Sequence, residues 1–309
     1  MLEVESSAAF LKEAFDHAAI IAVTDARGVI TSVNSRFCAL SGYSEEELIG
    51  NTHRIVRSGF HDRSFFTSLY RTISRGHVWH GEICNRAKDG ALYWVDTTIV
   101  PRRGHSGKIE SYTAIRFDIT PQKEAEEALW QLANIDALTG LPNRRKFIED
   151  LEHHVAHGGE PLIVAMIDVD EFKRVNDGFG HDTGDRLLEA VGGRIHASLG
   201  PSDIVGRLGG DEFALILRNP ALDGEDRRIA RILAAAREPI AIDGERHQTS
   251  ASIGTARYPD DGTTAREMLK VADISLYQAK AKGGDRAEAF TEELRRNALR
   301  PERIRRTKD

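Results

Sequence analysis

Two adjacent carboxylates follow a pair of glycines in the segment Arg207-Leu-Gly-Gly-Asp-Glu-Phe213. Gly209 and Gly210 supply the positive φ angles of a tight turn, and apolar stretches flank the segment on both sides. The sequence therefore predicts a β-hairpin that holds Asp211 and Glu212 at its tip, beside open space. Carboxylates in such a place suit a divalent cation and phosphate groups. A match of this length is also typical of an ordinary solvated hairpin.

A further carboxylate follows an apolar run of strand length at residues 162–167. The run is typical of a buried strand that delivers Asp168 to its own C-terminal end. Mg²⁺ prefers hard oxygen ligands, and one or two carboxylates usually hold it together with substrate phosphates. Asp168 and Asp211, at two strand ends, are therefore the expected pair of metal ligands.

Five motifs occur in order over the second half of the chain, and together they resemble the GGDEF family of diguanylate cyclases. They are Asp136-Ala-Leu-Thr-Gly-Leu-Pro-Asn-Arg144, Asp168-x-Asp-x-Phe-Lys173, Asn176-Asp-x-x-Gly-His-x-x-Gly-Asp185, Gly209-Gly-Asp-Glu-Phe213 and Ala272-Asp-x-x-Leu-Tyr-x-Ala-Lys280. The resemblance implies a nucleotidyltransferase that condenses two GTP molecules to cyclic di-GMP and releases two pyrophosphates. It also implies a palm-like domain of the nucleotide-cyclase type over residues 136–292.

The resemblance assigns roles to single residues. Two Mg²⁺ ions per active site, with Mn²⁺ as an alternative, are expected on Asp168, the carbonyl of Val169 and Asp211. Asp211 and Glu212 are the expected catalytic residues, and whether Glu212 acts mainly as a metal ligand or as a proton acceptor stays open. The residues expected to contact GTP are Phe172, Lys173, Asn176, Asp185, Gly209, Gly210 and Lys280.

Recognition of guanine and phosphate has a physical basis in four of these residues. Guanine offers N1–H and N2–H donors on one edge, so a side chain that accepts both rejects adenine. Asn176 and Asp185 match the family's base-binding positions, although such residues are also common helix caps. Backbone N–H groups of the turn 169–173, at a helix start, are expected to bind phosphate, with Lys173 and Lys280 adding positive charge. Taken alone, Lys280 would be a solvated helix end.

The chain departs from the family pattern at two places. Gly284 stands where members often carry an arginine that contacts phosphate, and whether Arg286 or Lys282 replaces it stays open. Residues 200–203 are Gly-Pro-Ser-Asp, where many cyclases carry the Arg-x-x-Asp of a product-inhibition site. Asp203 alone lacks the positive charge that would hold cyclic di-GMP, which predicts weak or absent feedback.

The composition is that of an ordinary globular chain with room for two domains. It has 309 residues, 40% hydrophobic content and a net charge of −6, which argues against a nucleic-acid partner. Two cysteines, Cys38 and Cys84, are too few for a disulfide scaffold and fit a reducing compartment. Because no apolar run approaches the length of a membrane segment, we expect a cytoplasmic protein.

Residues 1–120 are predicted to form a separate domain with five short strands, of which the last three form a meander. The predicted strands are 19–24, 29–33, 78–86, 91–100 and 109–118. With the stretches 42–50, 85–90 and 118–120, this half resembles a PAS sensor domain, an antiparallel sheet that carries helices over one face and leaves room for a ligand.

The ligand of this half is open. Segments beginning at Thr52 and Trp79 resemble PAS domains that hold FAD as a redox sensor, and in that interpretation Trp79 and Asn85 face the isoalloxazine. A packed cavity or another ligand is the alternative. His53 stands where light-sensing flavin PAS domains carry a reactive cysteine, which excludes a cysteinyl adduct. The signal and the sign of its effect stay open.

Residues 121–135 are predicted to form a signalling helix between the two domains. Its residues Ala125, Ala128, Leu132 and Ile135 make an a/d seam of about two heptads, typical of a short coiled coil. A linker that packs on its own domain is the alternative. Since two GTP-loaded domains must meet to form the product, we expect a homodimer through the linker and facing cyclase domains.

The expected whole is thus an α+β protein: an N-terminal PAS sheet with helices, a helical linker, a palm-like cyclase domain and a charged tail at 293–309. Its expected function is that of a diguanylate cyclase regulated by the PAS domain. The alternative is a catalytically weak GGDEF module that binds GTP or cyclic di-GMP as a regulatory switch, which intact Asp168, Asp211 and Glu212 weigh against.

Overall fold

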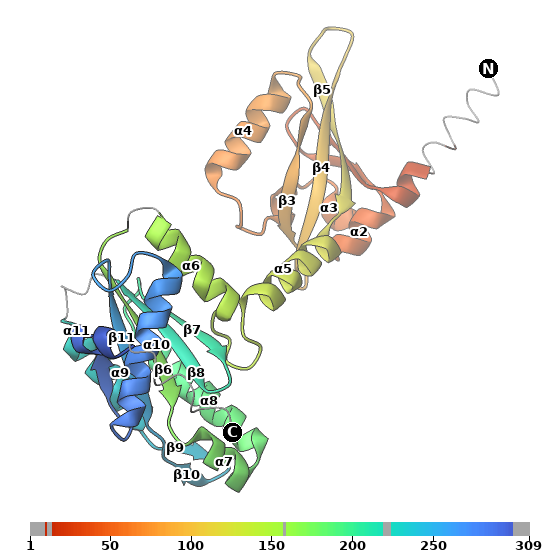
Figure 1. The fold of residues 1–309 in the computed structure, drawn as a ribbon. Helices are drawn as coiled ribbons and strands as arrows, with labels where there is room; N and C mark the ends of the chain where they lie inside the picture. Colours follow the sequence, from red (N-terminus) through yellow and green to blue (C-terminus); the bar gives the residue numbers. More distant parts are fainter. Residues whose placement is uncertain (1–9, 11–13, 157–158, 219–223, 299–309) are drawn as a thin grey trace. The chain divides into compact units, whose positions relative to one another are not determined.

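The structure is a computed structural model that describes residues 10, 14–156, 159–218 and 224–298. It divides into two compact units whose border falls within one helix, between Ala128 and Leu129. The predicted α+β class is confirmed, with an antiparallel sheet in the first unit and a helix-covered mixed sheet in the second (Figure 1). Within the described ranges, no helix is both long enough and apolar enough to cross a membrane.

The first unit is built on an antiparallel sheet with the strand order β2-β1-β5-β4-β3, so the predicted meander is present. Its strands are β1 (Ile20–Asp25), β2 (Ile30–Val33), β3 (Trp79–Arg86), β4 (Leu92–Arg103) and β5 (Ile109–Asp118). One face packs against α2 (Ser35–Ser41), α3 (Glu45–Leu48), the 3-10 helix His53–Val56 and α4 (Arg63–Ser74).

Side-chain caps set the starts of α2, α3 and α4. The Asn34 side chain accepts the N–H of Phe37 at 3.2 Å, and Ser44 and Glu47 form a capping box at the start of α3. Asp62 accepts the N–H of Phe65 at 2.8 Å and so begins α4, a helix that the sequence analysis missed.

The second unit contains a mixed sheet in the order β12-β11-β6-β8-β7, in which only the pairing of β12 with β11 is parallel within the described residues. Its strands are β6 (Leu162–Val169), β7 (Ile204–Gly209), β8 (Glu212–Arg218), β11 (Ala251–Tyr258) and β12 (Ala287–Ala289), beside a small sheet of β9 (Ile240–Ile242) and β10 (Glu245–His247). Its helices are α6 (Arg144–Ala156), α7 (Phe172–Phe179), α8 (His181–Ala197), α9 (Glu225–Arg237), α10 (Ala265–Ala281) and α11 (Glu292–Ala298).

Residues 293–298 belong to helix α11, so this part of the predicted charged tail at 293–309 is helical. Residues 299–309 lie outside the described residues.

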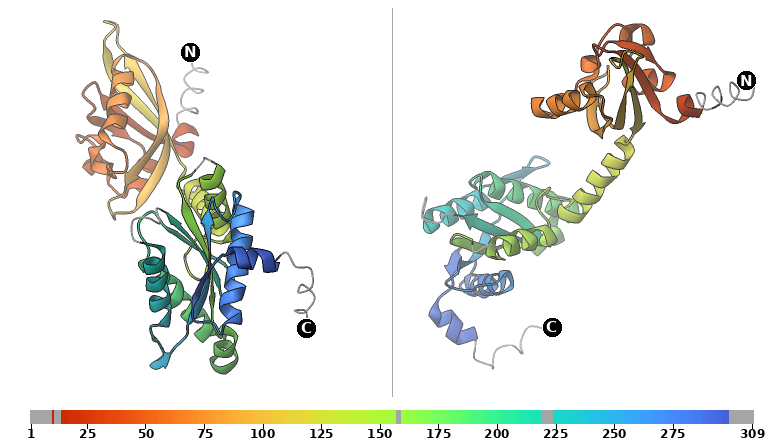
Figure 2. Two further views of the ribbon diagram at one scale, coloured as in Figure 1. Left: turned by 60° about the vertical axis from the view of Figure 1, so that its left-hand side comes forward. Right: turned by 90° about the horizontal axis from the view of Figure 1, so that it is seen from above.

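Strand β6 is buried along its whole length because helices cover both faces of the sheet (Figure 2). Its odd-numbered residues Ile163, Ala165 and Ile167 pack into a core with α8 and α9. Its even-numbered residues Leu162 and Val164 pack into a second core with α6 and α10. Side chains alternate along a strand, so Asp168 is directed to the side of the sheet that α10 covers.

Helix α10 lies directly on the backbone of β11. A Cβ at Gly254 would stand 2.0 Å from the backbone nitrogen of Leu276 and 2.2 Å from the carbonyl oxygen of Ala272. No side chain fits there, and the close approach sets the position from which the end of α10 reaches the site described below.

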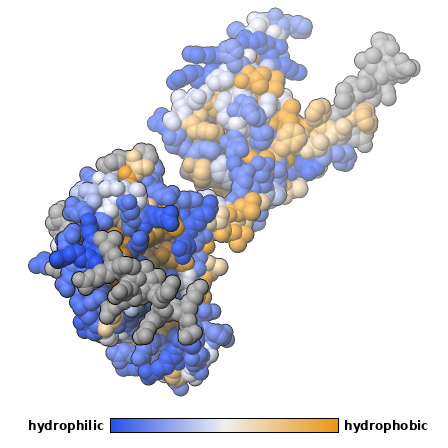
Figure 3. All heavy atoms as spheres, viewed as in Figure 1, coloured by the Kyte–Doolittle hydropathy of each residue, from blue (hydrophilic) through white to orange (hydrophobic). Residues whose placement is uncertain are grey.

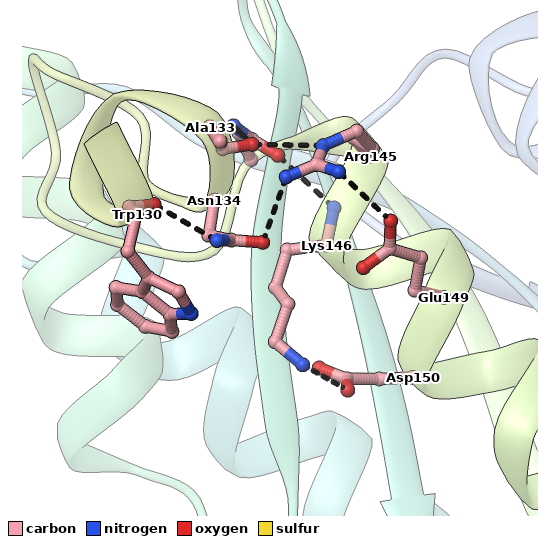
Figure 4. Close-up of polar contacts among 8 residues, drawn as sticks. Trp130, Ala133, Asn134, Arg145, Lys146, Glu149 and Asp150 are labelled. Atoms are coloured by element: carbon pink, nitrogen blue, oxygen red, sulfur yellow. Dashed lines mark hydrogen bonds and ion pairs between the residues drawn. The ribbon is translucent and has the colours of Figure 1, made fainter. Parts of the chain in front are cut away.

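The C-terminal end of the linker helix α5 (Thr120–Asn134) lies beside the start of α6 (Figure 4). The Arg145 guanidinium donates to the carbonyl of Ala133 at 3.0 Å, to the Asn134 side chain at 3.1 Å and to Glu149 at 3.2 Å. The bond to Ala133 satisfies one of the backbone carbonyl groups that a helix leaves without partners at its C-terminus. Ile135 lies beyond the helix end, so the predicted seam loses its fourth member.

The linker helix leaves large apolar side chains uncovered within the chain. Leu129, Trp130 and Leu132 are 66%, 48% and 77% exposed, and an apolar area lies over this helix in Figure 3. Ala125 and Ala128, the first two seam residues, are exposed as well. These seam residues therefore do not pack on their own domain, which was the alternative to a coiled coil.

We expect Gly254→Ala to destabilise the second unit by about 1–3 kcal/mol, because its methyl group forces α10 away from the sheet. Urea unfolding followed by far-UV circular dichroism measures the loss. Gly193→Ala is the matched control, since Gly193 lies in α8 with open space at its Cβ, and it should gain up to about 1 kcal/mol. Equal stability of the two variants would contradict the packing described here.

Candidate functional site

The carboxylates of the two predicted acidic elements meet at one edge of the second sheet. Asp168, next to the end of β6, lies directly opposite Glu212, the first residue of β8. The N–H of Val169 donates to the carbonyl oxygen of Asp211 at 3.2 Å. Asp168, Asp211 and Glu212 are thus brought together by strand pairing.

Lys280, near the end of α10, reaches the Asp168 carboxylate from the side of the sheet that α10 covers. Its ammonium nitrogen lies 2.5 Å from the Asp168 carboxylate, with 45% of the Lys280 side chain and 10% of the Asp168 side chain exposed. The interpretation of Lys280 as a merely solvated helix end is therefore wrong.

Asp168 has an unusual electrostatic environment. Burial raises the pKa of Asp168 above its ordinary value, and the neighbouring charge of Asp211 acts in the same direction, while the hydrogen bond from Lys280 opposes both. A carboxylate in such surroundings gains from a nearby cation, which Lys280 supplies here. A divalent cation beside Asp168 would stabilise its carboxylate in the same way.

The predicted Gly-Gly turn is present between β7 and β8, with φ of 141° at Gly209 and 56° at Gly210 and open space at both Cβ positions. Arg207 holds this turn: its guanidinium donates to the carbonyl of Gly210 at 3.0 and 2.8 Å and to Asp136 at 3.0 Å. Burial alone would raise the pKa of Asp136, but hydrogen bonds from Thr139 and Arg207 hold it below its ordinary value. The sequence analysis gave no role to Arg207, although it begins the acidic segment.

Asp170 is a second residue without a predicted role. Its carboxylate accepts the hydroxyl groups of Ser250 and Ser252 at 2.6 Å each, and the N–H of Asp285 at 2.9 Å. It therefore ties the loop after α10 to the end of β6. The same arrangement favours a glycine at position 284, because a Cβ there would lie 3.1 Å from the Asp170 carboxylate.

The two candidates for the missing arginine have partners inside the protein. Lys282 lies 2.8 Å from Glu288, and the Arg286 Nε donates to the carbonyl of Gly284 at 3.2 Å.

The turn before α7 presents backbone N–H donors to a ligand, as the sequence analysis expected. However, not all the N–H groups of residues 169–173 are available. The N–H groups of Val169 and Asp170 already donate to Asp211 and Ser250. Those of residues 171–173 stand at the start of α7, where a helix leaves N–H groups without intrahelical acceptors. Glu171 has a φ of 56°, a left-handed conformation that is costly for this residue type and typical of functional turns.

The remaining predicted substrate contacts lie on α7 and α8. Lys173 and Asp185 are exposed, whereas Phe172 packs against the core beside α8. The Asn176 Oδ1 atom is buried and has no hydrogen-bond partner among the described residues. It occupies the space that a Cβ at Gly184 would fill, 1.9 Å from that position.

Mg²⁺ fits the donor set of this edge. Asp168, Asp211 and Glu212 offer hard carboxylate oxygens, and the carbonyl of Val169 adds another. As placed here, no three His, Cys, Asp or Glu side chains in the described part of the chain gather closely enough to hold a metal ion by themselves. Substrate phosphates would have to complete the coordination.

Asp203, the remnant of the product-inhibition pattern, is buried and used inside the protein. It accepts the N–H of Gly200 at 2.9 Å and that of Arg218 at 3.0 Å, and it pairs with the buried Arg228. These contacts leave Asp203 a structural role.

The first unit contains a cavity of about 720 Å³ between the sheet and α4. Asn85 lines it, as the FAD interpretation requires. Trp79 is absent from the lining, and its ring packs edge-on against Phe65 at 5.7 Å between centroids. Of the two residues expected to face an isoalloxazine, Asn85 but not Trp79 lines the cavity, and the flavin contact stays a prediction. His53 lines the cavity too.

Comparison with known proteins matches both halves of the chain. A family model described as a diguanylate cyclase GGDEF domain covers residues 133–286, and one described as a PAS domain covers residues 17–121. Cyclic di-GMP phosphodiesterase PdeR of Escherichia coli (strain K12) is 32% identical over 289 residues, which are 90% of this chain and 42% of PdeR.

Two further similarities concern the second unit. Diguanylate cyclase TpbB of Pseudomonas aeruginosa (strain UCBPP-PA14) is 40% identical over 163 residues, 51% of this chain and 38% of TpbB. A solved structure of the GGDEF domain alone of TpbB from Pseudomonas aeruginosa is 37% identical, with a TM-score of 0.50, over 54% of this chain and 99% of that one. The chain spans less than half the length of both curated relatives.

We expect the stability of the second unit to fall as pH rises through the raised pKa of Asp168. In that window, above the ordinary value of 3.8, the folded state binds the proton more tightly than the unfolded state does. Lys280→Met should steepen the fall, because it removes the hydrogen bond that opposes the shift. Asp168→Asn should abolish this contribution.

Urea unfolding at a series of pH values measures this dependence. Lys282→Met is the matched control, since Lys282 pairs with Glu288 and leaves Asp168 untouched. Identical pH profiles for wild type and Asp168→Asn would count against the electrostatic account.

Proposed function

The chain belongs to the GGDEF family, with a PAS domain before its GGDEF domain, and we propose that it is a diguanylate cyclase. In the proposed reaction the 3′-hydroxyl of one GTP attacks the α-phosphorus of another and pyrophosphate leaves. The second attack closes cyclic di-GMP. The observation that carries the proposal is the pairing of Asp168 with Glu212 beside Asp211, with Lys280 at 2.5 Å.

Charge explains why these groups suit the reaction. The triphosphate of GTP is strongly anionic and must be neutralised before an oxygen nucleophile can approach. Asp168, the carbonyl of Val169 and Asp211 would hold Mg²⁺, two ions per site, with Mn²⁺ as an alternative. When bound, the metal supplies charge neutralisation and polarises phosphoryl oxygens.

Lys280 has a second anionic partner once a triphosphate is present. Its ammonium group is half-exposed, so it can turn from Asp168 to phosphate, and a bound Mg²⁺ would then neutralise the buried Asp168 carboxylate in its place. Lys173 and the N–H groups at the start of α7 supply further donors to phosphate oxygens. Gly209 and Gly210 leave room for the nucleotide to approach the backbone.

Glu212 is the proposed acceptor of the 3′-hydroxyl proton, or a further metal ligand. It lies opposite Asp168 at the strand end, where a carboxylate can reach either group. Asp211 completes the acidic set as the other catalytic residue.

Guanine recognition is assigned to Asn176 and Asp185. The buried Oδ1 of Asn176 lacks a partner, which supports a role as acceptor for a guanine N–H, because a buried acceptor without a donor is costly. Asp185 is exposed on α8 and can accept the second donor of the same base edge.

A homodimer follows from the chemistry, since each domain is expected to bind one GTP. We place the pairing on the exposed apolar side chains of α5 and on facing GGDEF domains. The exposure of Leu129 and Leu132 supports the linker part of this assignment. The PAS domain would regulate how often the two GTP sites meet.

A regulatory switch without catalysis is the second candidate. PdeR, whose name is that of a phosphodiesterase, aligns with 90% of this chain. In that case the GGDEF domain would bind GTP or cyclic di-GMP without turning it over. The two functions differ in whether product forms.

FAD in the first unit, a cytoplasmic location, and weak feedback through residues 200–203 stay predictions from the sequence. Absorbance of the purified protein near about 450 nm checks for FAD.

We expect the protein to convert GTP to cyclic di-GMP with Mg²⁺, and Glu212→Gln to lower the rate at least about a hundredfold, because the charge that assists the attack is lost. Mass spectrometry identifies the product. Glu245→Gln, on exposed β10, is the matched control and should keep the wild-type rate. Binding of GTP without any product would favour the switch instead.

Leu132→Glu should weaken dimerisation and lower specific activity at low protein concentration, since it puts a charge into the proposed seam. Sedimentation velocity and activity against concentration measure both effects. Ser68→Glu, on exposed α4, adds the same charge elsewhere and should change neither. An unchanged dimer in Leu132→Glu would place the interface elsewhere.

A further inference from the structure

Arg116 places a guanidinium on the core side of the first sheet. It lies on β5, the middle strand, where Tyr112, Ala114 and Arg116 alternate toward the cavity. Only 5% of Arg116 is exposed. Its neighbours across the sheet are Ile20 on β1 and Thr97 on β4. A charge in such a position is costly unless something pairs with it.

The chain itself offers Arg116 little compensation. Its Nη1 is buried without a hydrogen-bond partner, and no carboxylate of the described residues forms an ion pair with it. The guanidinium carbon lies 5.4 Å from the centroid of the Phe37 ring, a cation–π contact. Burial lowers the pKa of Arg116 to about 10, so the group still carries its charge at neutral pH.

His53 presents a second unsatisfied group to the same cavity. Its Nε2 is buried and unpartnered, and its ring stacks on Phe37 at 5.9 Å between centroids. Burial, followed by the charge of Arg116, lowers the pKa of His53 well below its ordinary value. The imidazole is therefore neutral and offers one N–H donor.

The rest of the wall combines apolar surface with positive charge at its edge. Leu69, Ile73, Ile83 and Ile99 contribute the apolar part. The exposed arginines that line the cavity are Arg27, Arg54, Arg57 and Arg63. Among the lining residues there is no aspartate or glutamate. An apolar body with an anionic group matches both features, and a volume of about 720 Å³ accommodates a small organic molecule.

We propose that this cavity binds a small organic carboxylate with an apolar body, whose carboxylate accepts hydrogen bonds from Arg116 and His53. The guanidinium pairs with a carboxylate through two parallel hydrogen bonds, which compensates its buried charge. Binding at this site is independent of catalysis in the second unit, so its test and the cyclase assay fail separately.

The test uses the full chain and isothermal titration calorimetry with straight-chain carboxylates from butanoate to dodecanoate and with benzoate. The matching alcohols serve as uncharged probes. We expect at least one carboxylate to bind and its alcohol to bind at least about tenfold more weakly. Arg116→Met should weaken the carboxylate about tenfold to a hundredfold and leave the alcohol unchanged.

Arg71→Met is the matched control, because Arg71 is exposed on α4 and does not line the cavity, and it should bind as wild type does. Arg116→Met should also melt no lower than ligand-free wild type, since it removes an unpaired buried charge. If that variant fails to fold, Arg116→Gln replaces it in the titration.

The proposal would be overturned by failure of every carboxylate to bind wild type, by equal binding of carboxylate and alcohol, or by unchanged carboxylate binding in the Arg116 variants. Flavin that co-purifies with wild type and with Arg116→Met alike would also overturn it, because the cavity would then hold a ligand that does not need the guanidinium.

Discussion

The burial of β6 on both faces is the constraint on which the second unit depends. Because its side chains alternate between two cores, the side of the sheet that Asp168 faces is fixed by the packing of Leu162, Val164 and Met166. A shift of one residue in register would turn these groups into the other core and take Asp168 away from Lys280. The position of the acidic site is thus set by apolar packing that has no part in the chemistry.

Asp168 and Arg116 are both buried charged residues, but their surroundings differ. Asp168 stands at a strand end, where Lys280 reaches it from solvent and where further cations can approach. Arg116 stands in the middle of a strand, and the cavity beside it is lined by residues that share its sign of charge or carry none. An unpaired buried charge is costly, so Arg116 would gain from a ligand of opposite charge, whereas Asp168 already has a cation beside it.

Local sequence patterns predicted the elements whose signals are strong. The apolar run before Asp168 and the glycine pair of the hairpin both appear as expected. Strands β9, β10 and β12 are three residues long, so their pairing partners define them more than their own residues do. Helix α4 was missed although Phe65, Leu69 and Ile73 recur at helical spacing after the capping Asp62.

The sequence alone could not reveal the roles of Arg207, Asp170 and Arg116, because each depends on the surroundings of the side chain in the folded protein. Arg207 bonds Asp136, 71 residues away, and Asp170 bonds Ser250, 80 residues away, so each role exists only in the folded chain. On β5 the outward residues include Ile115 and Phe117, as apolar as the inward Tyr112 and Ala114. Alternation alone therefore gave no basis for placing Arg116 inside.

Hydrogen bonds connect the end of the linker helix to the acidic hairpin within the second unit. The N–H of Asn143 donates to the carbonyl of Asn134 at 2.8 Å, and the N–H of Arg207 donates to the carbonyl of Pro142 at 2.9 Å. The side chain of Arg207 then holds Gly210. A displacement of the C-terminal end of α5 must break one of these bonds or move the hairpin with it. Because Asp211 and Glu212 follow Gly210 directly, these bonds link the position of the C-terminal end of α5 to that of the acidic residues.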